Sequence, residues 1–134
     1  MARAAEPFQY AMLRVMPRLE RGEALNAGVV LFCRPLRFLG ARVELDGVLL
    51  AALAPGCDAG EVRAQLDTLE AVAAGRPEGG HVATLPQSER FHWLTAPAST
   101  IVQPSPVHTG LTADPAGELD RLFAELVSRP GRRG

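Results

Sequence analysis

Three side chains that could bind a ligand together lie in residues 21–28, RGEALNAG. The guanidinium of Arg21 suits a carboxylate or a phosphate, the carboxylate of Glu23 can take a proton, and the amide of Asn26 can donate and accept hydrogen bonds. A structural alternative explains the same residues. In it, Arg21 and Glu23 pair with each other or with water. Gly22 then permits a turn, and Asn26 fixes the end of the loop.

A second group of candidate residues lies between residues 90 and 110, RFHWLTAPASTIVQPSPVHTG. Proline and glycine flank His108, which predicts a loop, and its imidazole could move a proton or bind a metal near neutral pH. Gln103 could orient a ligand through its amide. Ser99 and Thr100 carry hydroxyl groups, but no GxSxG turn surrounds them, so nucleophilic catalysis is not indicated.

The same segment holds the one tryptophan of the chain. Trp93 lies two residues after Phe91, and we predict that it anchors the core, because aromatic side chains bury large areas. The histidines, His81, His92 and His108, have neither the i, i+4 spacing nor the cysteine partners of a zinc site. We therefore expect no metal site and no cofactor.

Three strands that could position these residues are predicted in the first third of the chain. Residues 8–16 and 39–45 alternate in the manner of strands with two different faces. Residues 26–34 form an almost continuous apolar run, which is typical of a central strand covered on both faces. A tight connection at residues 34–37 completes an antiparallel meander. Gly28, inside the middle strand, indicates a bulge or a backbone that another group approaches closely.

Helix signals dominate the rest of the chain. Asp58 and Glu61 have the spacing of a capping box, and Gly75 marks the end of the helix that they begin. Asp114, with a proline directly after it, begins the last helix. Residues 75–81, GRPEGGH, are predicted to form a flexible link. Shorter helices or turns are predicted at residues 47–54 and at residues 88–94, the second with Ser88 as its cap.

The order of these elements predicts an α+β fold. Residues 99–103 supply a fourth strand, which Pro104 and Pro106 confine to an edge of the sheet or to its own end. We expect an antiparallel sheet of about four strands, with two main helices and one or two short helices packed on one face of it. Residues 1–129 would form a single domain, followed by a frayed tail at residues 130–134.

Composition and charge limit the classes of function. The chain has 134 residues, of which 47% are hydrophobic and 22% charged, and these values are typical of one globular domain. A net charge of −1 argues against non-specific nucleic-acid binding, although the first third holds an excess of arginine. The apolar runs are far shorter than the roughly 20 residues that cross a bilayer, and the N-terminus lacks the pattern of a secretory signal. We therefore expect a cytoplasmic protein, with Cys33 and Cys57 as buried thiols.

The polar segments belong to a wider combination of motifs. These are residues 10–14, Pro17, RGE at 21–23, NxG at 26–28 followed by VVLF, RFxWL at 90–94, Ser99, Gln103 and SPVHTG at 105–110. In this combination, which covers nearly the whole chain, the sequence resembles the uncharacterised bacterial domain-of-unknown-function family 3037. The RGExxNxG block is its most specific part. The resemblance implies a small bacterial protein that is often encoded beside a HipA-like kinase, and it implies no catalytic residues.

We favour one function, a non-catalytic binding or regulatory module that contacts a partner protein. The resemblance makes a HipA-like kinase the candidate partner. A flat apolar patch with an arginine rim would support this function. Nucleic-acid binding is the weakest possibility, because the sequence has no helix-turn-helix or zinc-finger spacing and its arginines are dispersed among acids. The sequence does not determine the oligomeric state.

The alternative function is a small enzyme or a nucleotide- or phosphate-binding protein. In it, Arg21 holds an anion, and Glu23 or His108 transfers protons. Asn26 and Gln103 orient the ligand. This alternative requires the loop that holds the first three polar residues to meet the segment near His108 in one concave polar pocket.

Overall fold

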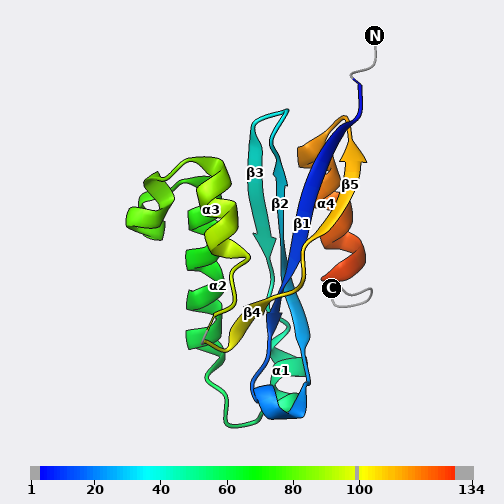
Figure 1. The fold of residues 1–134 in the computed structure, drawn as a ribbon. Helices are drawn as coiled ribbons and strands as arrows, with labels where there is room; N and C mark the ends of the chain where they lie inside the picture. The colour runs from blue at the N-terminus through cyan, green and yellow to red at the C-terminus, as the bar shows by residue number, and fades with distance from the viewer. Residues whose placement is uncertain (1–3, 99, 129–134) are drawn as a thin grey trace.

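The computed structural model describes residues 4–98 and 100–128 (Figure 1). Over these residues the sheet contains five strands: β1 (Glu6–Val15), β2 (Leu25–Cys33), β3 (Phe38–Val43), β4 (Val102–Pro104) and β5 (His108–Thr112). Four α-helices accompany it: α1 (Gly47–Leu53), α2 (Ala59–Ala74), α3 (Gln87–Leu94) and α4 (Pro115–Leu126). Short 3-10 helices lie in the connections: η1 (Leu19–Arg21), η2 (Pro77–Gly79) and η3 (His81–Thr84). The predicted α+β class is confirmed, whereas the predicted tail at residues 130–134 lies outside the described residues.

Strand β1 holds three other strands in place. β1, β2 and β3 form the predicted antiparallel meander, with β2 in the middle. The order across the sheet is β3-β2-β1-β4, and β5 also pairs with β1. β4 lies beside the C-terminal end of β1, where Leu13 is opposite Pro104, and β5 lies beside its N-terminal half, where Tyr10 is opposite His108. β4 and β5 therefore follow one another along the same edge of β1.

Ser105 joins β4 to β5 at a point where two prolines interrupt the strand. The backbone N–H of Met12 donates to Ser105 Oγ at 2.9 Å, and the N–H of Ser105 donates to the carbonyl of Met12 at 2.8 Å. The serine hydroxyl thus replaces a backbone acceptor in the ladder. β5 then resumes pairing one residue out of register with β4, which is a bulge on this side of β1.

This junction corrects two sequence predictions. The strand predicted at residues 99–103 begins only at Val102, and the loop predicted around His108 is strand β5. The extra residue at the bulge breaks the two-residue alternation that would have revealed a strand. Pro104 and Pro106 nevertheless confine β4 to the edge of the sheet, as predicted.

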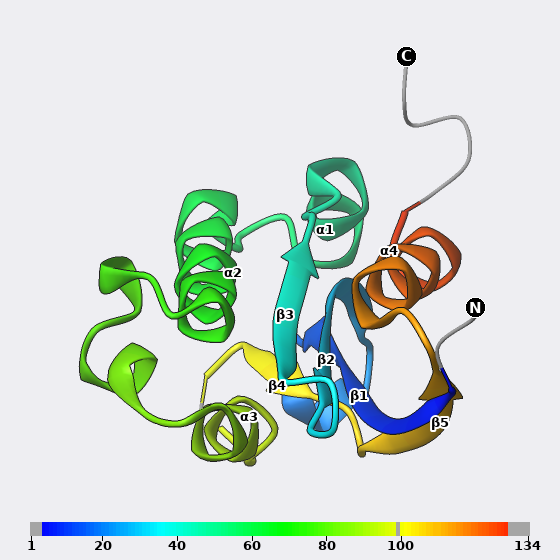
Figure 2. The same ribbon diagram turned by 90° about the horizontal axis from the view of Figure 1, so that it is seen from above.

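Helices cover both faces of the sheet, which corrects the prediction that they pack on one face (Figure 2). The reason lies in β2, which is buried on both sides. Val30 and Phe32 belong to the core that β2 forms with α2 and α3. Val29, Leu31 and Cys33 belong to a second core, which β2 forms with α4. The predicted central strand, covered on both faces, is therefore confirmed.

Most of the predicted helix ends are confirmed. The side chain of Asp58 accepts hydrogen bonds from N–H groups in the first turn of α2, and Gly75 ends that helix with a left-handed φ of 74°. The side chain of Asp114 caps α4 in the same way. Ser88 does not cap α3, because this helix begins directly after Pro86. None of the helices in the described ranges is long and apolar enough to cross a membrane.

The predicted flexible link at residues 75–81 is instead folded into the turns of η2 and η3. Arg90, from α3, holds it to the end of α2. Its Nη1 donates to the carbonyls of Val72 and Ala73 at 3.0 and 2.8 Å, and its Nε donates to the carbonyl of Leu85 at 2.8 Å. The last carbonyls of a helix lack partners within the helix, so one arginine satisfies the end of α2 and fixes the connection to α3.

Gly28 lies at a bulge between β1 and β2, where the register shifts between Leu13 and Arg14. A Cβ atom at Gly28 would lie 3.0 Å from the carbonyl oxygen of Arg42 and 3.0 Å from Val43 Cγ1. Both sequence interpretations of this glycine, a bulge and a close approach, are therefore confirmed.

We expect Gly28→Ala to lower the free energy of unfolding by about 1–3 kcal/mol, because the added methyl group must displace the packed backbone of β3. Gly47→Ala is a matched control, since a Cβ atom at Gly47 meets no other atom within 4 Å. It should leave stability unchanged or raise it by up to about 1 kcal/mol. Urea denaturation compares the two variants, and equal stabilities would contradict the crowding at Gly28.

Candidate functional site

The polar residues of the first segment contact one another and the protein backbone. Arg21 Nε lies 3.0 Å from Glu23 Oε1, with side-chain exposures of 57% and 38%. The hydrogen bond to Glu23 raises the pKa of Arg21. Gly22 ends η1 in the left-handed conformation, and Asn26 Nδ2 donates to the carbonyl of Leu126 at the end of α4, at 3.1 Å. These contacts are the ones that the structural alternative predicts: an ion pair, a turn and a fixed loop end.

The second segment is divided between two places in the sheet. Asn26 and Gln103 flank Arg14 on β2 and β4, so these three residues form one row across the sheet. His108 lies opposite Tyr10, four residues before Arg14 and therefore about 13 Å along the strand from that row. The rings of His108 and Tyr10 have centroids 5.2 Å apart. The loop that contains η1 follows the C-terminal end of β1, beyond Arg14. The structure therefore separates His108 from the first segment.

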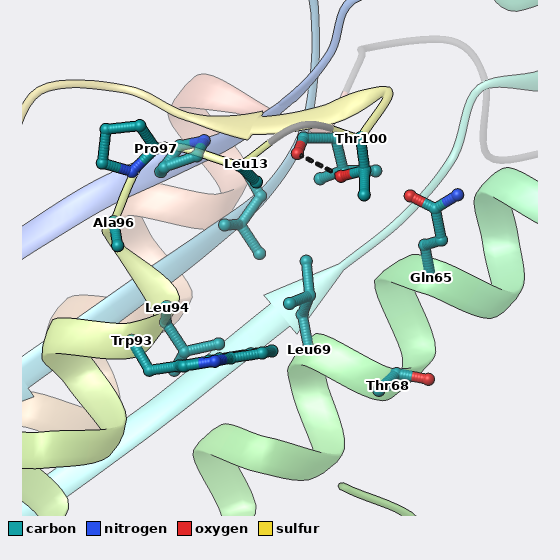
Figure 3. Close-up of a pocket in the computed structure, with 12 residues that line it drawn as sticks. Leu13, Gln65, Thr68, Leu69, Trp93, Leu94, Ala96, Pro97 and Thr100 are labelled. Carbon is teal, nitrogen blue, oxygen red and sulfur yellow. Dashed lines mark hydrogen bonds between the residues drawn. The ribbon is translucent and has the colours of Figure 1, made fainter. Parts of the chain in front are cut away.

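A cavity of about 490 Å³ lies between α2, α3 and residues 96–98 and 100–104 (Figure 3). Its volume is within the range of about 300–1,000 Å³ that is usual for ligand sites. Among the residues that the structure describes, no ionisable side chain and no residue of the 21–28 segment lines it. The described residues with polar side chains in its lining include Gln65, Thr68 and Thr100. Most of the wall is apolar and includes Leu13, Leu69, Trp93, Leu94, Val102 and Pro104.

Trp93 forms part of the cavity wall and is 45% exposed, which corrects the prediction that it anchors the core. Helix geometry gives the reason. Phe91 and Leu94 lie three residues apart, on one side of α3, and both are buried in the core. Trp93 projects from an adjoining side, and Figure 3 shows its indole extending toward Leu69.

Gln103 holds the loop that lines the cavity. Its Nε2 donates to the carbonyls of Ala98 and Thr100, the second at 2.5 Å, and its Oε1 accepts from the N–H of Ala98 at 3.2 Å. Thr100 Oγ1 adds a hydrogen bond to the carbonyl of Val102 at 3.1 Å. In this structure the amide of Gln103 therefore positions the cavity wall. The candidate residue Ser99 lies outside the described residues.

The chemistry that this cavity offers is apolar contact with a few neutral hydrogen-bonding groups. Such a site can bind an apolar group and orient it by an amide or a hydroxyl. Within residues 4–98 and 100–128, no three His, Cys, Asp or Glu side chains are grouped so that they could hold a metal ion.

Sequence reasoning missed this cavity because its walls come from distant elements. One signal was present. Residues 91–113 contain no Asp, Glu, Lys or Arg, although 22% of the whole chain is charged. That uncharged segment contains Trp93, the loop that Gln103 holds, and all of β4 and β5. A depletion of charge beside an aromatic residue is a feature of binding surfaces.

We expect Gln103→Ala to loosen the cavity wall. The N–H of Ala98 loses its acceptor, so it should exchange with deuterated water at least about tenfold faster. Gln87→Ala is a matched control, because Gln87 makes a comparable bond to the carbonyl of Arg37 at 3.1 Å, away from the cavity. Hydrogen exchange followed by NMR measures both variants. Unchanged exchange of Ala98 in Gln103→Ala would contradict the role of Gln103.

Comparison with known proteins gives one match. A family model described as "Protein of unknown function (DUF3037)" matches residues 10–127, which is most of the chain. No curated protein and no solved structure matches the chain. The matched range contains both polar segments and every residue that lines the cavity. The chain therefore belongs to the DUF3037 family.

Proposed function

We propose that this protein is a non-catalytic binding or regulatory module that takes apolar side chains of a partner protein into the cavity beside Trp93. The observation that carries the proposal is the indole, 45% exposed, in the wall of an apolar cavity. Tryptophan is enriched among the residues that contribute most to binding energy at protein interfaces, where a well-packed pocket excludes water. A partner that covers Trp93 would remove this apolar surface from solvent.

The candidate partner is a HipA-like kinase encoded nearby, and this choice rests on the family resemblance alone. A bacterial cytoplasmic location fits the free thiols of Cys33 and Cys57, because disulfides are rare in that compartment. Regulation would follow if binding changes the activity of the kinase.

The alternative, a small enzyme or a phosphate-binding protein, has less support. It needs Arg21 to hold an anion, but Glu23 already pairs with that guanidinium. Asn26 donates to the carbonyl of Leu126, and His108 lies far along β1 from Asn26. The cavity is therefore a better-supported binding site than these side chains.

We expect Trp93→Ala to weaken binding to the kinase at least about tenfold, because the apolar groups of the partner lose the indole surface. Val48→Ala is the control: Val48 is 81% exposed, but it lies on α1 and outside the cavity. Isothermal titration calorimetry with the purified kinase measures both affinities, and kinase assays with each variant measure regulation. If Trp93→Ala bound as tightly as the wild type, the cavity would not be the interface. A wild-type protein that did not bind would exclude this kinase as the partner.

Trp93 should also report occupation of the cavity directly. The chain contains one tryptophan, so labelling with 5-fluorotryptophan gives one fluorine resonance. We expect unlabelled kinase to shift or broaden this resonance as the indole leaves water. A resonance that stays unchanged at saturating kinase would place the binding site elsewhere.

A further inference from the structure

Strand β5 has one edge with which none of the described residues pairs. β5 pairs with β1 on its inner side, and within residues 4–98 and 100–128 no strand pairs with it on the outer side. Figures 1 and 2 both show β5 at the outer margin of the sheet. The direction of its outer backbone groups decides what this edge can bind.

Hydrogen bonds on β1 show which residues of β5 face inward. Met12 exchanges hydrogen bonds with Ser105 on this side of β1. Because backbone groups alternate along a strand, Tyr10 and Phe8 also direct their N–H and C=O groups toward this side. The residues of β5 opposite them, His108 and Gly110, are therefore the ones that bond to β1.

Thr109 and Leu111 alternate with these inward residues. They therefore direct their N–H and C=O groups away from the sheet. Pro7 gives an independent check. It lies opposite Leu111, and because proline has no N–H, these two residues cannot exchange a pair of hydrogen bonds. The outer edge of β5 thus presents two donors and two acceptors from Thr109 and Leu111.

The strand lacks the features that usually prevent edge pairing. Soluble proteins protect exposed edges with charged residues, prolines or bulges within the strand. The β5 sequence HTGLT contains no proline or charged residue, and the surrounding residues 91–113 contain no Asp, Glu, Lys or Arg. Leu111 is also 69% exposed. Pairing with another strand would satisfy the outer backbone groups and cover this leucine.

We propose that β5 pairs with β5 of a second copy of the chain, antiparallel about a twofold axis at Gly110. The sheet then continues through both copies. In this register Thr109 of each copy lies opposite Leu111 of the partner subunit. The two residues exchange hydrogen bonds, so the outward N–H and C=O groups of both are satisfied.

Charge and shape favour a second copy as the occupant. The strand has no charged residue, so a twofold copy places no like charges opposite each other. On the axis Gly110 faces itself in the closest type of strand pair, with Cα atoms about 4.5 Å apart. The space beside Gly110 is filled by the ring of Phe8, because a Cβ atom at Gly110 would lie 2.7 Å from two ring carbons. A larger residue at this position would disturb both the ring and the axis.

Analytical ultracentrifugation of the isolated protein at micromolar concentration tests the dimer. We expect the wild type to have about twice the chain mass of 14.3 kDa. Leu111→Lys and, separately, Thr109→Lys should each weaken dimerisation at least about tenfold, because lysine on an edge opposes strand pairing. Val48→Lys is the matched control, since it adds the same charge at an exposed site on α1 and should leave the dimer intact. Circular dichroism confirms that each variant is folded.

A wild-type protein that keeps the mass of one chain would overturn this inference. A dimer that survives both Leu111→Lys and Thr109→Lys would overturn it equally, because pairing would then use another surface. The measurement contains no kinase, so its outcome is independent of the proposed function.

Discussion

The burial of β2 on both faces is the constraint on which the rest of the structure depends. Residues 29–33 are at most 5% exposed, so this strand has no side that can face water. A fully buried apolar side chain contributes roughly 1.5–3 kcal/mol to stability, and such a strand must therefore be covered twice. α2 and α3 cover one face, and α4 covers the other. The positions of all three helices follow from this single strand.

β1 connects the buried strand β2 to the strands at the edge of the sheet. One edge of β1 pairs with β2, and its other edge pairs with β4 and β5. Ser105 allows this succession, because its hydroxyl bonds to Met12 at the point where the two strands change register. The side of β1 that carries Leu13 thereby becomes part of the cavity wall, together with Val102 and Pro104 of β4. The uncharged segment of residues 91–113 supplies part of this wall and also the outer strand β5.

Local patterns in the sequence were enough to predict much of the fold. The apolar run of β2, the cap at Asp58 and the cap at Asp114 each depend on neighbouring residues, and each is confirmed. β5 was missed because its pairing depends on Ser105 and Met12, which are 93 residues apart. The cavity was missed for a similar reason, since the exposure of Trp93 depends on how α3 is turned against α2. Complementary residue types in RGEALNAG could not show whether they serve a ligand or one another, and the structure shows them in contact with one another and with Leu126.

The second core has a consequence for how the chain acquires its structure during synthesis. Helix α4 covers one face of β2. Val29, Leu31 and Cys33 therefore become buried only after residues 119–127 have left the ribosome. β1, β2 and β3 can form a meander long before that moment, with one apolar side still open. At a synthesis rate of about 5–20 residues per second, this interval lasts several seconds. During this interval, the nascent chain exposes an apolar surface that is buried in the folded protein. A chaperone that binds apolar segments would bind the nascent chain there.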